Sequence, residues 1–221
     1  YNNKIPQIIS NQFVADTDTP VSALLKISNN QKYSFLLESV EGGKQRGRYS
    51  LLGCEPDLIW KINKNGKVKI KTNSLYLNNK INLNLNPIRS LKNILQLSKV
   101  YRNPKDPPYP ILVGYLGYPM IKYMENINLN NPDTLKIPEA MLIRPKIAAV
   151  FDNIKDTIDI MTVVYPEEDI TGEKALESSI ELIKLNIKKL NSKIQENKKL
   201  NINNAFKEIK IKSNFEKKKL S

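Results

Sequence analysis

The dipeptide Asn65-Gly66 is the feature that most constrains how this chain can fold. It lies between two segments of strand-like composition, 57–63 (DLIWKIN) and 67–72 (KVKIKT). Asn and Gly readily adopt the positive φ angles of the two-residue turns that join neighbouring antiparallel strands. The sequence therefore predicts a β-hairpin here and, with it, an antiparallel sheet.

Other segments have the composition of strands and extend this sheet. Two apolar runs, 34–40 (SFLLESV) and 48–53 (RYSLLG), are joined by a link that opens with Glu41, Gly42 and Gly43. The run 111–117 (ILVGYLG) has glycines where another backbone can come close. Segments 146–152 and 156–165 indicate a second hairpin, and the first of them is nearly all apolar, so we expect it to be central in the sheet.

Helix signals lie between these strands. Thr19-Pro20 opens a helix to residue 27, and Asn86-Pro87 opens another, because a polar cap followed by proline suits a first turn. A short helix is expected at 120–125. Over 171–195 the apolar residues recur every three or four positions and form one stripe, which favours core packing over a coiled coil. The predicted fold class is α+β, with mostly antiparallel sheet layers and covering helices.

The composition removes several classes of chemistry. The chain has no histidine and one cysteine, Cys54, which excludes an internal disulfide, a cysteine-cluster zinc site and histidine-dependent nucleophilic catalysis within this chain. Without metal or histidine beside it, Cys54 is expected to be an inert core residue, like Trp60. No apolar stretch is long enough for a membrane span. The chain starts at Tyr1 with nothing resembling a signal peptide, so we expect a cytoplasmic protein.

The net charge of +13 is concentrated near one end. Residues 182–221 carry 12 lysines against 3 glutamates, and only five of the 35 basic residues in the chain are arginine. Nucleic-acid surfaces favour arginine and interleaved aromatic residues. A solvated lysine-rich face is therefore the favoured interpretation, and a basic nucleic-acid-binding module is kept as an alternative.

From the residues alone no catalytic site assembles, but one segment stands out. Residues 35–57 (FLLESVEGGKQRGRYSLLGCEPD) combine acidic, hydroxyl, glycine and arginine residues on adjoining apolar strands. With the rest of the chain this segment strongly resembles the N-terminal domain of anthranilate synthase component I, the large subunit. The matching motifs, in order, are TPV (19–21), LLES (36–39), EGG (41–43), GRYS (47–50), G-x-x-P-D (53–57), GYLGY (114–118) with Glu125 behind it, PEAMLIRPKIAAVFD (138–152) and SNF (213–215). The chain departs from the family at Pro119, directly after GYLGY, where the family usually has an acidic residue.

The resemblance implies a fold and an activity for a longer protein. The fold would be part of a four-layer α/β/β/α sandwich. The whole subunit, a lyase, would use Mg2+ to convert chorismate and ammonia to anthranilate and pyruvate in tryptophan biosynthesis. A glutamine amidotransferase subunit, component II, would supply the ammonia, and L-tryptophan would inhibit by feedback.

The resemblance also divides the chain. Residues 1–195 would be the regulatory N-terminal domain, 196–212 a linker, and 213–221 the start of a truncated catalytic domain. The ligands of Mg2+ and chorismate would lie in the missing C-terminal domain. The present chain alone is therefore expected to be inactive, with neither a nucleic acid nor a membrane as partner.

The tryptophan-binding residues implied by the resemblance are Leu37, Glu38 and Ser39, with Tyr49 and Ser50 on the next strand. Ser39 is the strongest candidate, because its hydroxyl can accept from an ammonium and donate to a carboxylate. Strand alternation puts Leu37 and Ser39 on one face and Glu38 on the other, unless a bulge intervenes. Two simpler roles stay open: Ser39 bonded to neighbouring backbone, and Arg48 paired with Glu38 or Glu41.

Two further alternatives remain at this stage. The large subunit of aminodeoxychorismate synthase, of the folate pathway, shares the fold, but Glu38 and Gly42-Gly43 favour the tryptophan pathway. The other is a stand-alone amino-acid-sensing domain with no enzyme attached.

Overall fold

The computed structural model describes residues 5–41, 45–78, 80–82, 84–103, 106–129, 135–167 and 170–194, with the backbone alone at 39–41, 45 and 46. The predicted linker and the start of the second domain lie outside these residues. The elements are β1 (Gln7–Val14), α1 (Pro20–Ser28), β2 (Phe35–Glu41), β3 (Gln45–Ile62), β4 (Val68–Thr72), α2 (Leu75–Asn78), α3 (Pro87–Leu97), β5 (Val113–Leu116), the 3-10 helix η1 (Tyr118–Tyr123), β6 (Ala140–Asp152), β7 (Thr157–Val164) and α4 (Gly172–Leu190).

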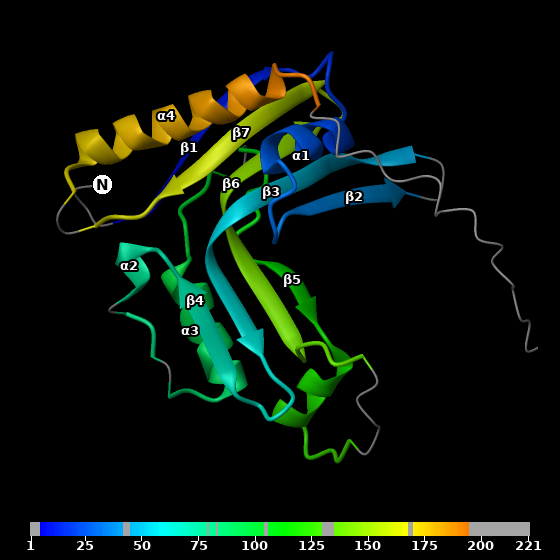
Figure 1. Cartoon of the computed structure of the whole chain (residues 1–221), viewed down its shortest axis with the longest axis vertical. Coiled ribbons are helices and arrows are strands. Elements are labelled where there is room, and N and C mark those ends of the chain that lie inside the picture. The colour runs from blue at the N-terminus through cyan, green and yellow to red at the C-terminus, as the bar shows by residue number, and fades with distance from the viewer. Residues whose placement is uncertain are drawn as a thin grey trace, which may run out of the picture.

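Seven strands form one sheet in which every pairing is antiparallel. Its order is β1-β7-β6-β3-β2, with β4 added to the far end of β3 and β5 to the far end of β6. Strands β3 and β6 are 18 and 13 residues long, so each pairs with different neighbours at its two ends. Figure 1 shows these two strands running through the whole molecule. The α+β prediction is confirmed.

The prediction of two separate strands at 48–53 and 57–63 is wrong, because both belong to β3. Between them the register with β6 shifts at Pro56 and Leu58, and Glu55 has a φ of 51°. Pro56 lies opposite Pro145 of β6, and neither proline has an N–H for the sheet ladder. A bulge therefore bends β3 here while β6 continues alongside it.

The bulge has a consequence for the two hydrophobic cores. Residues 147, 149 and 151 of β6 pack in the upper core beneath α1 and α4, whereas residues 140 and 142 join the lower core. Odd and even residues of one strand point to opposite faces. The two cores therefore lie on opposite faces of the sheet, and in Figure 1 α1 lies in front of β3 whereas α3 lies behind β4.

Each core is built from fully buried side chains. Cys54 is buried in the upper core and Trp60 in the lower one, which confirms both core predictions. The indole Nε1 of Trp60 donates to Ser90 Oγ at 3.0 Å, so the one polar atom of this side chain is satisfied. This hydrogen bond joins α3 to β3.

Most predicted helices form where their caps indicate. Thr19 caps α1 and Asn86 caps α3 through side-chain oxygens, and Gly66 turns the predicted hairpin with a φ of 74°. The helix expected at 120–125 is instead a 3-10 helix over Tyr118–Tyr123, with Pro119 in its first turn.

The apolar stripe of α4 packs on the upper core, as predicted, although its first residues are partly exposed. Leu176 and Ile180 are 43% and 38% exposed, whereas Ile183 and Leu190 are buried. Near the helix end, Lys26 Nζ of α1 donates to Leu190 O at 2.8 Å. Helix α1 therefore packs beside the C-terminal half of α4 and leaves its first turns open.

Candidate functional site

The five residues predicted to bind tryptophan lie where β2 meets β3, but they divide between the two faces of the sheet. Leu37 is opposite Leu51, and Glu38 is opposite Ser50. Leu37 and Tyr49 therefore share one face, and Glu38 and Ser50 share the face on which α1 and α4 pack.

Ser39 lies at an irregular point of the pairing. The register between β2 and β3 shifts between Glu38 and Val40. A bulge, which the sequence analysis allowed for, is therefore present here. Because of it, simple alternation along the strand does not assign Ser39 to either face. Its side chain lies outside the described residues.

The face with Leu37 and Tyr49 presents a partly exposed apolar surface. Leu37 is 47% exposed, while Tyr49 and Leu51 are half-buried. Phe35 lies over Gly53, where an added Cβ would come within 2.7 Å of the ring. Phe35, Leu37, Tyr49 and Leu51 form what we call the β2–β3 apolar face, which can contact a flat apolar group.

Arg48 stands at the edge of this face and pairs with Asp152 rather than with Glu38; the side chain of Glu41 lies outside the described residues. Its Nη2 donates to Asp152 Oδ2 at 3.0 Å, and its guanidinium lies 4.8 Å from the centre of the Tyr49 ring. Burial raises the pKa of Asp152, but hydrogen bonds from Arg48 and two backbone N–H groups outweigh it and lower that pKa overall. Arg48 is 46% exposed, and its Nη1 makes no hydrogen bond to any described residue, so it can still meet a carboxylate.

Ser50 is already engaged within the protein. It is buried, and Asn153 Nδ2 donates to its hydroxyl at 3.4 Å and to Gly47 O at 2.8 Å. The hydroxyl therefore helps to hold the turn between β6 and β7 against β3.

A second polar group was missed by sequence reasoning and lies at the bend of the sheet. Arg144 is 1% exposed, and its guanidinium donates to both carboxylate oxygens of Asp57. Its Nη1 donates to Ser98 Oγ at 3.3 Å, and its Cζ lies 4.0 Å from the centre of the Tyr165 ring. Arg144 and Asp57 both lie in the motifs that resemble the family, so the sequence contained a signal for this pair. This pair fixes the bend and reaches no reacting group.

The described residues were compared with what a metal-ion site and a membrane-spanning helix require. Within the described ranges no three His, Cys, Asp or Glu side chains gather closely enough to hold a metal ion. None of the helices described is both long and apolar enough to cross a membrane.

The fold is that of an α+β domain with one antiparallel sheet and covering helices. No family model matches the chain. It is similar to anthranilate synthase component 1 of Cereibacter sphaeroides, with 34% identity over 179 residues, 80% of this chain and 36% of that protein. It is similar to the same component of Acetivibrio thermocellus, with 30% identity over 219 residues, 97% of this chain and 42% of that protein. The chain belongs to the anthranilate synthase component 1 family and spans about two-fifths of the relatives it matches.

One solved structure is also similar to this chain. The crystal structure of anthranilate synthase component I from Streptococcus pneumoniae matches 82% of this chain and 37% of its own, with 18% identity and a TM-score of 0.48. The family named from the sequence motifs is thus confirmed by the sequence relatives, while the four-layer sandwich and the domain boundaries stay predictions.

Proposed function

We propose that this chain is part of an anthranilate synthase large subunit. The whole subunit would use Mg2+ to convert chorismate and ammonia to anthranilate and pyruvate in tryptophan biosynthesis. A component II glutamine amidotransferase would supply the ammonia. The supporting observation is the similarity to relatives named anthranilate synthase component 1, one of which aligns with 97% of this chain.

The chain alone would not carry out this reaction, because the part described offers no set of metal ligands. The test is to assay the complete subunit and the 221-residue chain with chorismate, ammonia and Mg2+. We expect fluorescent anthranilate from the first and none from the second. Aminodeoxychorismate as the product of the complete subunit would favour the folate-pathway alternative and overturn the proposal.

The role proposed for this portion is feedback binding of L-tryptophan at the β2–β3 apolar face. The observation that carries it is that Leu37 and Tyr49 share an open face with Arg48 at its edge. The apolar side chains would contact the indole, and the half-exposed guanidinium would meet the carboxylate. Ser39 would serve the ammonium or the carboxylate.

Glu38 and Ser50 have a different part in this proposal. Both lie on the opposite face, and Ser50 is already bonded to Asn153. Their substitution would therefore change tryptophan binding only through the position of the strands. This separates the five predicted residues into those that touch the ligand and those that do not.

Replacing Ser39 in the complete enzyme tests the role directly. Ser39→Ala should weaken tryptophan inhibition by about 1–3 kcal/mol, or about 5- to 150-fold, because it removes a hydrogen bond to a charged group. Uninhibited turnover should stay unchanged. Ser178→Ala, an exposed serine of α4, is the matched control and should leave inhibition as it is. An unchanged inhibition constant in Ser39→Ala would refute the assignment.

A further inference from the structure

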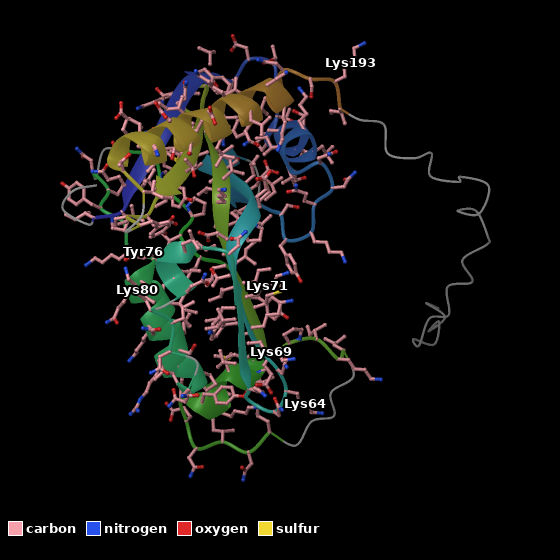
Figure 2. All side chains as sticks on the ribbon, turned by 60° about the vertical axis from the view of Figure 1, so that its left-hand side comes forward. Lys64, Lys69, Lys71, Tyr76, Lys80 and Lys193 are labelled. Carbon is pink, nitrogen blue, oxygen red and sulfur yellow. The ribbon has the colours of Figure 1, made fainter. Side chains whose placement is uncertain are left out.

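Lysines gather on one open face of the lower half of the sheet. Lys61 of β3 lies directly opposite Lys69 of β4, and Lys71 is two residues further along β4. These three share a face, because Trp60 and Ile70 between them point into the lower core. Figure 2 shows Lys69 and Lys71 following one another along β4. Like charges directly opposite each other are destabilising, so an arrangement of this kind needs a reason.

Tyr33 brings a hydroxyl group into the same place. Lys61 Nζ donates to Tyr33 Oη at 3.0 Å and lies 4.8 Å from the centre of its ring. That hydrogen bond, with the charges of Lys61, Lys32 and Lys71, lowers the pKa of Tyr33. The positive charges of Lys32 and Lys71 thus act on this phenol in addition to the direct contact with Lys61. Because Tyr33 Oη accepts from Lys61, its own hydrogen remains available to a further acceptor.

The backbone holds Tyr33 in this position at a cost. Its φ is 65°, in the left-handed region that bulky residues rarely adopt. Such a conformation is strained and persists only where the surroundings enforce it. The segment between α1 and β2 thus places the phenol beside Lys61 despite backbone strain.

The lysine cluster, Lys32, Lys61, Lys69 and Lys71, has no acidic partner within the described part of the chain. The ion pairs found there involve other cations: Lys26, Arg48, Lys122, Arg144 and Lys189. The cluster therefore presents only hydrogen-bond donors, four ammonium groups and one phenol O–H.

We propose that the lysine cluster and the Tyr33 hydroxyl form a binding site for a multivalent oxyanion of the phosphate class. Neighbouring strands are about 4.8 Å apart, and alternate side chains of one strand are about 7 Å apart. Lysines at this backbone spacing have side chains long enough to direct several ammonium groups at one anion, and lysine is a common point-charge ligand for phosphate. The site is separate from the β2–β3 apolar face, because Lys61 lies beyond the bulge of β3.

The competing explanation is protection of the sheet edge. Strand β4 pairs only with β3, and lysines on edge strands prevent pairing with other chains. Edge protection requires the charges of the lysines but neither the contact with Tyr33 nor saturable binding of a ligand. An experiment that measures saturable anion binding therefore distinguishes the two explanations.

The experiment is a titration of the 221-residue chain with pyrophosphate at constant ionic strength, followed by NMR of ring-labelled tyrosine. We expect a saturable one-to-one shift of the Tyr33 resonance. Lys61→Gln and Lys69→Gln should each weaken binding at least about fivefold. Tyr33→Phe, whose binding is followed by calorimetry because it lacks the Tyr33 resonance, should weaken it at least about twofold. Lys92→Gln, an exposed lysine of α3, is the matched control and should bind like the parent.

Fluorescence of the buried Trp60 checks that each variant is folded. Lys69 is exposed, so its replacement keeps the test valid even if Lys61→Gln does not fold. A shift that does not saturate, or one that Lys92→Gln weakens as much as Lys69→Gln does, would overturn the proposal in favour of edge protection.

Discussion

Replacing Arg144 should cost more stability than any exposed lysine or arginine would. Arg144 is 1% exposed, and the side chain of its partner Asp57 is 15% exposed. In Arg144→Met the Asp57 carboxylate loses two charge-assisted hydrogen bonds, and the methionine cannot replace the stacking on Tyr165. Breaking a buried pair by removing one partner typically costs about 3–5 kcal/mol, because the remaining charge is buried uncompensated. We expect a loss in free energy of unfolding of that size.

Urea unfolding followed by the fluorescence of Trp60, the only tryptophan in the chain, measures this loss. The double variant Arg144→Met, Asp57→Leu is the decisive comparison. It buries no unpaired charge, so it should be more stable than either single variant. A single-variant loss below about 1 kcal/mol, or a double-variant loss equal to the sum of the two singles, would refute the reasoning.

Three further predictions concern other buried groups. Ser90→Ala should lower the free energy of unfolding by about 1–3 kcal/mol, because it leaves the Trp60 N–H unpaired; an unchanged urea midpoint would contradict this. Burial, with the charge of Glu55, raises the pKa of Cys54 to about 12, so thiol reagents at pH 8 should label it only after urea unfolding. Burial also raises the pKa of Asp159, so stability from this group falls as pH rises from the ordinary carboxyl range through that raised value. Asp159→Asn should be at least as stable as the parent at pH 7, with an advantage that vanishes in acid; a less stable variant at pH 7 would count against the assignment.

The elements that could be predicted are those specified by neighbouring residues. The turn at Asn65-Gly66 and the caps at Thr19 and Asn86 form as expected, because a dihedral preference or a side-chain oxygen three residues away decides each one. The motifs that indicated the family are likewise short stretches of sequence, and the sequence relatives confirm that family.

The placement of the candidate residues in the sheet could be predicted only in part. The sequence placed Leu37 and Glu38 on opposite faces, as the pairing of β2 shows. It could not give Arg48 its partner, because Asp152 lies more than 100 residues further along the chain. The pairs considered were nearer in sequence, and sequence separation does not limit which strands become neighbours.

By itself, the amino-acid sequence determined the hairpins, the caps, the class of fold and the family, since these depend on local preferences and on short motifs. Only the tertiary structure decided that 48–53 and 57–63 are one strand, because β6 pairs along both sides of the bulge. That bulge shifts the alternation of β3 by one residue relative to β6. The two cores consequently occupy opposite faces of the sheet, and Lys61, Lys69 and Lys71 are left on the face that the lower core does not use.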